Sequence, residues 1–341
     1  MSSVAILGSG AWGTALAIHL CRQSADQVVL WARDPSRATS MQTARVNEQY
    51  LPNHPLPNNL RVSHDLTSAL SNASIWVIAV PSTSVIELID RCMDIPGATT
   101  TKTWIVATKG LLGAPCLGKT PTDIMVERGI PIEQIAVLSG ACFADELASG
   151  LFSSMICASK NSDVVDKTST LFEKWPLKIL PSTDITGLQW SAIYKNIAAV
   201  ASGIIVGLGH GHNAQAWLIV QALAEMKAVV THLGGLEATC DQLGGLGDLV
   251  LTTTGSLSRN RRLGQLIATG MSVSQAQTEI GQVTEGVSAV RILHQRLENG
   301  LDLPILNKTL AIVEGTAPVD SILPTDNSVV KPAGDVRLVE G

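Results

Sequence analysis

The sequence predicts an α/β fold in two parts, an N-terminal doubly wound sheet followed by an all-helical C-terminal domain. Three observations lead to this prediction. Short apolar, β-branched runs alternate with helix-like segments from Val4 to about Pro181. Long, Ala-rich segments with helical periodicity replace them after Ser182. The chain of 341 residues is also long enough for about two domains. Because parallel strands need long crossover connections, strands that alternate with helices indicate a mostly parallel sheet.

The expected strands all lie in the first half of the chain. They are Val4–Leu7, Val28–Trp31, Ile75–Val80, Trp104–Ala107, Ile135–Leu138, Met155–Ala158 and Leu177–Leu180. In the second half, the periodicity predicts long helices over 184–208 and 213–233.

We place the domain boundary between residues 183 and 184, where Ser182 or Thr183 could cap the first helix of the second domain. The first domain would span residues 1–183 and the second residues 184–315. The remaining segment, 316–341, is rich in Pro, Asp, Ser and Gly, which predicts a loop or a partly disordered tail.

The composition argues against several classes of protein. The 24 Lys and Arg against 29 Asp and Glu give a formal net charge of −5, which does not suit a protein that neutralises nucleic-acid phosphates. The six cysteines are scattered without a CxxC pair, so we expect no disulfide framework and no bound metal. The longest apolar stretch, 196–209, is too short to span a bilayer, and no charged leader precedes the first strand. We therefore expect a soluble, cytoplasmic protein.

A glycine motif follows the first strand. Residues 8–13 read GSGAWG, which is the pattern GxGxxG between a strand and a helix. Gly8 would permit the tight turn, Gly10 would let the backbone approach a pyrophosphate, and Gly13 would let helix and strand pack closely. The helix N-terminus directs amide groups at the anion. The motif therefore predicts a dinucleotide site in a Rossmann-like domain rather than an ordinary Gly-rich turn.

The end of the second strand indicates which dinucleotide binds. An NAD site usually has Asp or Glu there, which bonds the ribose 2′-hydroxyl. Here Arg33 comes first, and it can pair with a 2′-phosphate and stack on adenine, whereas Asp34 lies one step further on. This favours NADP(H) and leaves NAD(H) possible. The alternative is a solvated Arg33 at the strand end and an Asp34 that only opens the turn before the next helix.

Two lysines are candidates for chemistry. Pro81 and Lys109 each follow a buried strand, and ligands of doubly wound folds bind at the carboxyl ends of strands, so both should border the site. The less favoured alternative is that Lys109 is a solvated loop residue. Lys195 lies in an otherwise apolar helix over 193–203. Burying its charge is costly, so either its head group reaches water or its pKa is lowered for acid–base chemistry.

Polar residues further downstream could complete the site. Asp248 and Thr252 have the i, i+4 spacing that places two side chains on one helix face, although Asp248 alone could be an N-cap. Residues 258–262 form the densest basic cluster, and Ser258 could cap the helix that begins there. Its first amides and Arg259 would then form a phosphate pocket. A merely solvated basic turn is less favourable, because cations at a helix N-terminus oppose the macrodipole.

In combination, the motifs resemble those of a known family. They are GSGAWGTALA, ATKGL, LSGACFADELA, YKNIAAVASGI, GLGHGHNAQA, GGLGDLVLT, SRNRRLG and EGVSAV. As far as about Gly315, the sequence resembles the bacterial-type NAD(P)-dependent glycerol-3-phosphate dehydrogenases. The resemblance implies reversible NAD(P)H-dependent reduction of dihydroxyacetone phosphate to sn-glycerol 3-phosphate, carried out by a homodimer that supplies glycerophospholipid synthesis.

Motifs and resemblance together assign roles to individual residues. The catalytic residues would be Lys195, as general acid and base, with Asp248 and Lys109. The cofactor-binding residues would be Gly8, Gly10, Ala11, Trp12, Gly13, Arg33, Lys109, Ala144, Arg259, Val283 and Glu285. The substrate-binding residues would be Lys109, Gly140, Cys142, Asn196, Asp248, Thr252, Ser258, Arg259 and Asn260. Cys142 stands where the family usually has Ser or Thr, and a thiol is a weaker hydrogen-bond donor than a hydroxyl.

Two other functions fit parts of the same pattern. A β-hydroxyacid dehydrogenase or ketopantoate-type reductase also joins a Rossmann domain to a helical domain with an active-site lysine. Such an enzyme would bind a carboxylate, whereas the basic cluster at 258–262 favours a phosphate. A catalytically silent NADP-binding sensor would have no need for Lys109, Lys195 and Asp248 together.

Overall fold

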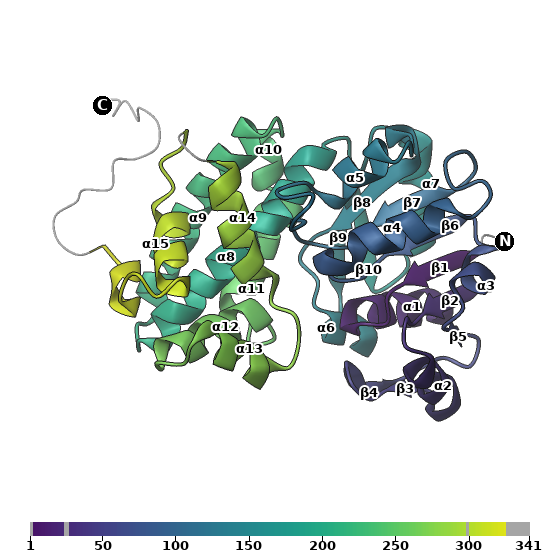
Figure 1. Ribbon diagram of the computed structural model, residues 1–341, viewed down its shortest axis with the longest axis horizontal. Coiled ribbons are helices and arrows are strands. Elements are labelled where there is room, and N and C mark those ends of the chain that lie inside the picture. Colours follow the sequence, from purple (N-terminus) through teal and green to yellow (C-terminus); the bar gives the residue numbers. More distant parts are fainter. Residues whose placement is uncertain (1–2, 24–26, 298–299, 325–341) are drawn as a thin grey trace.

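The computed structural model describes residues 3–23, 27–297 and 300–324. An α/β sheet domain occupies one end of the molecule, and an all-helical domain that begins with α8 (Ile185–Gly207) occupies the other (Figure 1). The predicted fold class is therefore confirmed.

The sheet of the first domain has eight strands in the order β10-β9-β8-β7-β6-β1-β2-β5. The strands are β1 (Val4–Leu7), β2 (Val28–Trp31), β5 (Arg61–Ser63), β6 (Ile75–Ile78), β7 (Thr103–Val106), β8 (Ile135–Ser139), β9 (Ser153–Ser159) and β10 (Leu177–Ser182). Neighbouring strands are parallel except for β8 and β9, which pair antiparallel with Val137 opposite Ala158. The sheet is thus mostly parallel, as predicted.

Three short strands were not predicted from the sequence. They are β5 and the two strands of a separate antiparallel pair, β3 (Val46–Asn47) and β4 (Leu51–Pro55). Each of them is at most five residues long, and β4 contains two prolines. Such segments lack the run of β-branched residues that identifies a buried strand.

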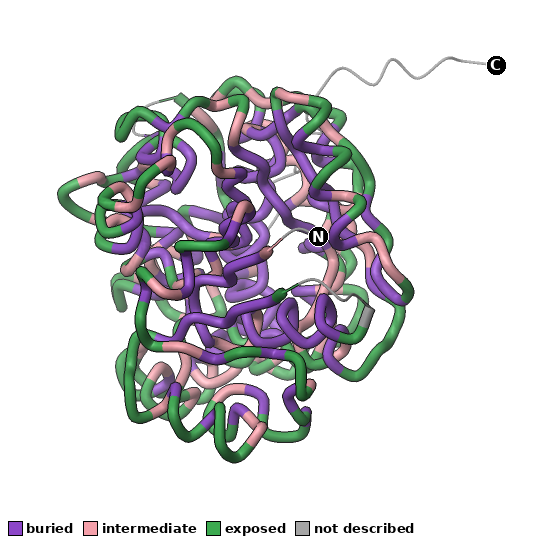
Figure 2. Tube along the Cα trace, turned by 90° about the vertical axis from the view of Figure 1, so that its right-hand side faces the viewer, coloured by how far each residue is buried: buried purple, intermediate pink, exposed green. Residues whose placement is uncertain are grey.

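Helices cover both faces of the sheet, which makes it doubly wound. One apolar layer joins the sheet to α1 (Ala11–Gln23), α2 (Pro35–Ala44), α6 (Ala144–Ser149) and α7 (Ser162–Phe172). The opposite layer contains α3 (Leu66–Leu70), α4 (Val85–Met93) and α5 (Pro121–Glu127). In β1, Val4 and Ile6 belong to the first layer, and Ala5 and Leu7 to the second. Seen from the sheet end, buried strands and helix faces lie inside a rim of exposed loops (Figure 2).

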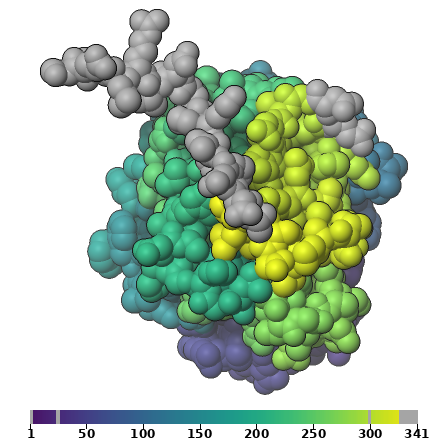
Figure 3. Space-filling view, turned by 90° about the vertical axis from the view of Figure 1, so that its left-hand side faces the viewer, coloured from purple at the N-terminus to yellow at the C-terminus, as the bar shows by residue number. Residues whose placement is uncertain are grey.

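Helix α8 forms the centre of the second domain. It is long and apolar enough to cross a membrane, but 89% of its apolar window is buried inside the protein, so it is packed as a core helix. Around it lie α9 (His212–His232), α10 (Glu237–Cys240), α11 (Asp248–Thr254), α12 (Arg259–Ala268), α14 (Glu285–Arg296) and α15 (Pro304–Val313), and α13 (Val273–Ile280) packs on α12. On the outer face of this domain, α15 lies beside α9 (Figure 3). Both predicted long helices are present as α8 and α9.

The cap of α8 differs from the prediction. Asp184, rather than Ser182 or Thr183, caps this helix, because its Oδ1 accepts a hydrogen bond from the Gly187 amide at 2.9 Å. Its Oδ2 accepts from the Thr239 hydroxyl at 2.6 Å, which ties α8 to α10. Ser182 instead accepts a hydrogen bond from the Asp184 amide. An aspartate is as good an N-cap as serine, so the local sequence alone does not decide between the three residues.

The helical domain continues to pack beyond residue 315, where the sequence suggested a tail. Residues Val319–Ile322 form a 3-10 turn, η4, and Ile322 is fully buried in the core of the domain. The rest of the expected tail, 325–341, lies outside the described residues.

Two glycines let α8 and α12 approach closely. A Cβ atom on Gly264 would lie 2.1 Å from the Val200 carbonyl oxygen, and one on Gly203 would lie 2.0 Å from the Arg261 carbonyl oxygen. No side chain fits at either position. This close approach places the first turn of α12 beside Asn196 of α8, and so it brings two parts of the candidate site together.

Candidate active site

The glycine motif forms the turn between β1 and α1. Gly8 has a φ of +126°, and a Cβ there would lie 2.7 Å from the Ala79 carbonyl oxygen. A Cβ on Gly13 would lie 2.0 Å from the Gly8 carbonyl oxygen. Both glycines are thus required for packing. A Cβ on Gly10, by contrast, would meet nothing within 4 Å, so this position leaves open space beside the backbone.

A cavity of about 700 Å³ lies between the two domains, next to this turn. Its wall includes Gly8, Gly10, Ala11, Arg33, Arg259 and Val283 of the predicted cofactor residues. Trp12, Gly13, Lys109, Ala144 and Glu285 are not part of the wall. The wall is strongly basic, since it contains the arginines Arg33, Arg37, Arg91, Arg259 and Arg291 but the single acidic residue Glu87. Such a surface suits a ligand with several phosphates.

Four residues at the Arg33 end of the cavity were not predicted from the sequence, namely Trp31, Arg37, Tyr50 and Arg91. The Arg37 guanidinium lies 5.2 Å from the Tyr50 ring centroid, and the Arg91 guanidinium lies 5.4 Å from that of Trp31. Arg37 follows Arg33 by four residues, a spacing that could have identified it. Tyr50 and Arg91 carry no such signal.

Asp34 caps α2 by accepting a hydrogen bond from the Arg37 amide at 2.8 Å. It therefore opens the helix, as the alternative interpretation expected.

Buried polar atoms near the glycine turn are without partners. The indole Nε1 of Trp12 and the hydroxyl of Ser9 are both buried and form no hydrogen bond within the described residues. A buried donor without an acceptor is costly unless a ligand supplies one. Together with the open space at Gly10 and the basic wall, these atoms fit a dinucleotide cofactor whose pyrophosphate lies at the start of α1.

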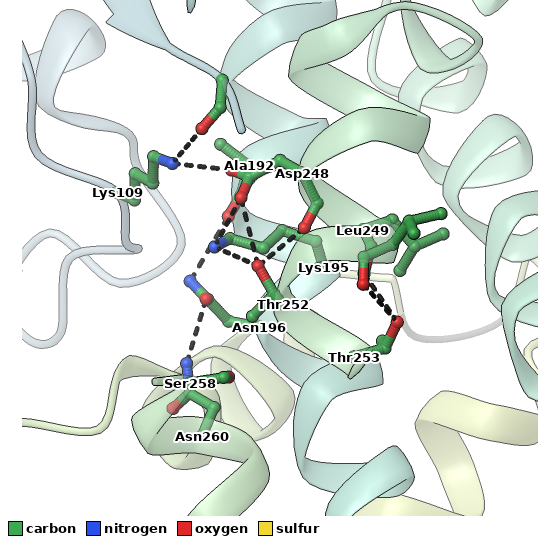
Figure 4. Close-up of polar contacts among 12 residues, drawn as sticks. Lys109, Ala192, Lys195, Asn196, Asp248, Leu249, Thr252, Thr253, Ser258 and Asn260 are labelled. Carbon is green, nitrogen blue, oxygen red and sulfur yellow. Dashed lines mark hydrogen bonds and ion pairs between the residues drawn. The ribbon is translucent and has the colours of Figure 1, made fainter. Parts of the chain in front are cut away.

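The two lysines and Asp248 form the centre of the site (Figure 4). Lys195 Nζ donates hydrogen bonds to Asp248 Oδ1 at 3.1 Å and to Thr252 Oγ1 at 2.9 Å. From the sheet domain, Lys109 Nζ donates to Asp248 Oδ2 at 2.6 Å and to the Gly140 carbonyl at 3.0 Å. Asp248 begins α11, but its carboxylate binds the two ammonium groups and forms no N-cap bond.

Burial sets the electrostatics of this centre. Lys195 is only 7% exposed, and burial lowers its pKa to about 8, although the Asp248 carboxylate opposes this shift. Burial also disfavours the ionised form of Asp248, but the charges of Lys109 and Lys195 outweigh it and hold the pKa of that carboxyl below its usual value. The site thus has an amine that can give or take a proton near neutral pH, beside a fixed negative charge.

The first turn of α12 lies next to this centre. Ser258 caps the helix, as predicted, by accepting from the Arg261 amide at 3.3 Å. Asn260 Nδ2 donates to Asn196 Oδ1 at 3.0 Å, and Asn196 follows Lys195 on α8. Arg259 faces the cavity and donates to Gln282 Oε1 at 3.1 Å. A helix N-terminus and a guanidinium therefore lie near the buried amine, which is an arrangement that can hold a phosphate.

The loop around Cys142 contributes mainly through its backbone. The Gly140 carbonyl accepts the Lys109 hydrogen bond. Cys142 and Ala144 are partly buried against the apolar core of the sheet domain. Burial raises the pKa of the Cys142 thiol to about 11, so it stays protonated.

Glu285, one of the expected cofactor residues, contacts the sheet domain. Its carboxylate accepts hydrogen bonds from the hydroxyl of Ser82 at 2.6 Å and from the amide of Ser82 at 3.1 Å. Ser82 was not singled out from the sequence, although the neighbouring Pro81 was expected to border the site.

Models of one protein family match both domains of the chain. The family model for the NAD-dependent glycerol-3-phosphate dehydrogenase N-terminus matches residues 3–165, and the model for the C-terminus matches residues 184–324. The chain belongs to this family. The family resemblance inferred from the motifs is therefore confirmed, and the second match spans η4.

Relatives of this dehydrogenase match nearly its whole length. It is 38% identical over 306 residues to the glycerol-3-phosphate dehydrogenase [NAD(P)+] of Thioalkalivibrio sulfidiphilus, covering 89% of this chain and 90% of that protein. The corresponding protein of Legionella pneumophila (strain Lens) is 37% identical over 314 residues, covering 92% and 93%. Among solved structures, glycerol-3-phosphate dehydrogenase from Coxiella burnetii superimposes with a TM-score of 0.88 at 33% identity, covering 94% of this chain and 97% of that one.

Proposed function

We propose that this dehydrogenase reduces dihydroxyacetone phosphate to sn-glycerol 3-phosphate with NAD(P)H, and catalyses the reverse reaction, at the centre formed by Lys195 and Asp248. The observation that carries this proposal is the placement of a buried amine between a basic interdomain cavity and the capped N-terminus of α12. Family membership supports a phosphorylated ketone over the carboxylate substrates of the alternative reductases, and the complete lysine–aspartate centre speaks against a silent sensor.

Both domains contribute to the proposed site. Residues 1–183 form the cofactor domain, in which Gly8, Gly10 and the start of α1 would hold the pyrophosphate and the neighbouring Ala11, Trp12 and Gly13 would shape its binding site. Residues 184–315 form most of the substrate domain. When bound, the cofactor supplies the hydride. Ala144, Arg259, Val283 and Glu285 complete the cofactor side.

Lys195 is the proton donor for ketone reduction. As negative charge develops on the carbonyl oxygen, the Lys195 ammonium donates a hydrogen bond and then a proton to it. Asp248 stabilises the charged amine, and the Thr252 hydroxyl fixes its direction. In alcohol oxidation, the neutral amine accepts the hydroxyl proton instead. Lys109 shares Asp248 with Lys195 and would contact both substrate and cofactor, as the family resemblance implies.

The substrate phosphate binds at the start of α12. Ser258, Arg259 and Asn260 present the capped helix N-terminus, a guanidinium and an amide there, and Asn196 holds Asn260 in place. Gly140 and Cys142 border the substrate from the sheet domain. By fixing the phosphate, these residues position the ketone carbon for reaction.

NADP(H) is the proposed preferred coenzyme, with NAD(H) as a possible substitute. Arg33 and Arg37 both face the cavity, and Asp34, the residue that could have bonded a 2′-hydroxyl, caps α2 instead. Two guanidinium groups favour a 2′-phosphate.

From the family resemblance we further propose that the protein is a cytoplasmic homodimer that supplies glycerophospholipid synthesis. Light scattering of the purified protein tests the dimer.

The test follows the absorbance of NADPH, and separately of NADH, after addition of dihydroxyacetone phosphate. Unphosphorylated dihydroxyacetone is the control, because it keeps the ketone and lacks the group that α12 would bind. We expect rapid turnover only with the phosphorylated ketone, and a higher kcat/KM with NADPH than with NADH. Equal rates with both ketones would contradict the phosphate pocket, and equal use of both coenzymes would contradict the role of Arg33.

A further inference from the structure

Asn47 carries a fully buried side-chain amide that the chemistry proposed above does not use. It ends β3, in the two-stranded ribbon of β3 and β4, which contacts α1 and α2 (Figure 1). Its Nδ2 donates two hydrogen bonds, and its Oδ1 accepts one. A buried amide is costly unless such partners satisfy it, so the partners of Asn47 indicate its role.

The Nδ2 atom of Asn47 holds the glycine motif. It donates to the Ser9 carbonyl at 2.9 Å and to Thr14 Oγ1 at 2.8 Å. Ser9 belongs to the turn between β1 and α1, and Thr14 lies in the first turn of α1. The buried Ser9 hydroxyl forms no hydrogen bond within the described residues. Asn47 therefore fixes the position of a residue whose hydroxyl is left for the cofactor.

The Oδ1 atom of Asn47 holds the turn that follows β3. It accepts a hydrogen bond from the Tyr50 amide at 3.4 Å, which closes the turn over residues 47–50. Tyr50 lines the cavity, and the Arg37 guanidinium lies over its ring. Arg37 Nη1 also donates to Gln49 Oε1 at 3.2 Å, within the same turn. The turn held by Asn47 thus supports the part of the cavity wall that Tyr50 and Arg37 form.

The partners of Asn47 require an asparagine at this position. The Ser9 carbonyl can only accept a hydrogen bond, and the Tyr50 amide can only donate one. An aspartate would direct an oxygen at the Ser9 carbonyl, and an alanine would leave the partners on both sides without their hydrogen bonds. One asparagine side chain satisfies both sides at once.

We propose that Asn47 is a positioning residue that joins the glycine turn, where the pyrophosphate would bind, to the cavity wall formed by Tyr50 and Arg37. The inference rests on the proposed function of the cavity as the NAD(P) site. Arg37 faces the cavity beside Arg33, where the 2′-phosphate carried only by NADPH would bind. Loss of Asn47 should therefore weaken both coenzymes at the turn, and NADPH further at the wall.

Coenzyme titrations of the full chain test this role. The dissociation constants of NADPH and NADH are measured by nucleotide fluorescence for wild type and Asn47→Ala. We expect Asn47→Ala to weaken NADPH binding at least about tenfold and to reduce the preference for NADPH over NADH about threefold. A general loss of stability would not change this preference. With NADPH saturating, kcat for dihydroxyacetone phosphate should stay within about threefold of wild type.

Two variants of the same ribbon are matched controls. Asn53→Ala removes an exposed amide from β4 and should bind both coenzymes like wild type. His54→Ala loosens the ribbon elsewhere, because the His54 Nε2 lies 2.8 Å from Oδ1 of Asp145 on α6. It does not touch the glycine turn, so the preference for NADPH should stay unchanged.

Thr14→Val is a second variant that keeps the shape of the side chain and removes one acceptor of Asn47. It should weaken NADPH and NADH by the same factor of about threefold, because the hydrogen bond to the Tyr50 amide remains.

Unchanged NADPH binding in Asn47→Ala, or in Thr14→Val if Asn47→Ala does not fold, would overturn the role of Asn47 and leave the cavity assignment intact. Equal losses for both coenzymes in Asn47→Ala, although wild type prefers NADPH, would overturn the connection to the wall. The same loss of preference in His54→Ala would also overturn it, because any loosening of the ribbon would then suffice. A wild-type chain that binds neither coenzyme would overturn the cavity assignment as well.

Discussion

The site depends on the charge of one residue, Asp248. Its carboxylate is 1% exposed, and it binds one ammonium group from each domain. An unpaired charge at this depth would be strongly disfavoured. The two lysines therefore keep Asp248 ionised, and Asp248 in turn keeps an amine with a lowered pKa near the point where proton transfer is useful.

The pKa of Lys195, about 8, predicts opposite pH dependences for the two directions of reaction. Ketone reduction needs the protonated amine, so its kcat should fall as the pH rises through about 8. Alcohol oxidation needs the neutral amine, so its kcat should rise over the same range. Steady-state rates with saturating substrates, from about pH 6 to about pH 10, measure both. Profiles that change in the same sense in both directions would contradict the acid–base role of Lys195.

Arg259 and Arg262 form a matched pair for testing the phosphate pocket. Both are on α12, but Arg259 faces the cavity, while Arg262 is exposed and its Nη2 lies 3.7 Å from Oε1 of Glu279. Arg259→Ala should raise the KM for dihydroxyacetone phosphate by about 10- to 100-fold, with a smaller change in kcat, because it removes a charge-assisted contact. Arg262→Ala should leave both constants near wild type. An unaltered KM in Arg259→Ala would remove this residue from the pocket.

At the scale of elements, α15 is anchored by a buried acid from another helix. Glu225 of α9 accepts hydrogen bonds from the Ile305 amide at 2.5 Å and the Leu306 amide at 3.1 Å, and it also accepts one from the Tyr194 hydroxyl at 2.5 Å. It thus caps α15 from a distance and connects it to α8. Burial raises the pKa of Glu225 to about 7, against the opposing effect of these hydrogen bonds.

This raised pKa predicts how stability depends on pH. The folded state holds the Glu225 proton more tightly than the unfolded state, so its contribution is complete below about pH 4.5 and is lost as the pH rises through about 7. Urea unfolding should show that wild type loses about 3 kcal/mol more than Glu225→Gln between pH 4.5 and pH 8. The exposed Glu279→Gln should behave like wild type. Equal losses in wild type and Glu225→Gln would contradict the assigned pKa.

Elements with strong local signals could be predicted from the sequence, and those without them could not. The seven apolar strands and the helices α8 and α9 have unambiguous periodicity, and the Ser258 cap follows from a serine before a helical segment. The strands β3, β4 and β5 depend on pairing partners more than on their own residues. The cap at Asp184 depends on contacts with Thr239 and Leu236, which lie far away in the sequence.

At the scale of the whole molecule, the site exists only where the two domains meet. Lys109 and Asp248 are 139 residues apart in the chain and 2.6 Å apart in space. The sequence predicted that both belong to the site, because each follows a recognisable motif. It could not predict that they bind each other, nor that Tyr50 and Arg91 complete the cavity wall, because these relations arise from packing of the domains. For the same reason, the contact between Ser82 and Glu285 could not be predicted from the sequence.

Replacement of Lys195 tests the account most directly. Lys195→Ala is compared with Lys178→Ala, which removes an exposed lysine from β10, by measuring kcat for reduction of dihydroxyacetone phosphate and the dissociation constant of NADPH. We expect Lys195→Ala to lower kcat by about 10²- to 10⁴-fold, with NADPH binding within about threefold of wild type and Lys178→Ala unaffected. A near-normal kcat in Lys195→Ala would contradict the proposal that this buried amine is the proton donor.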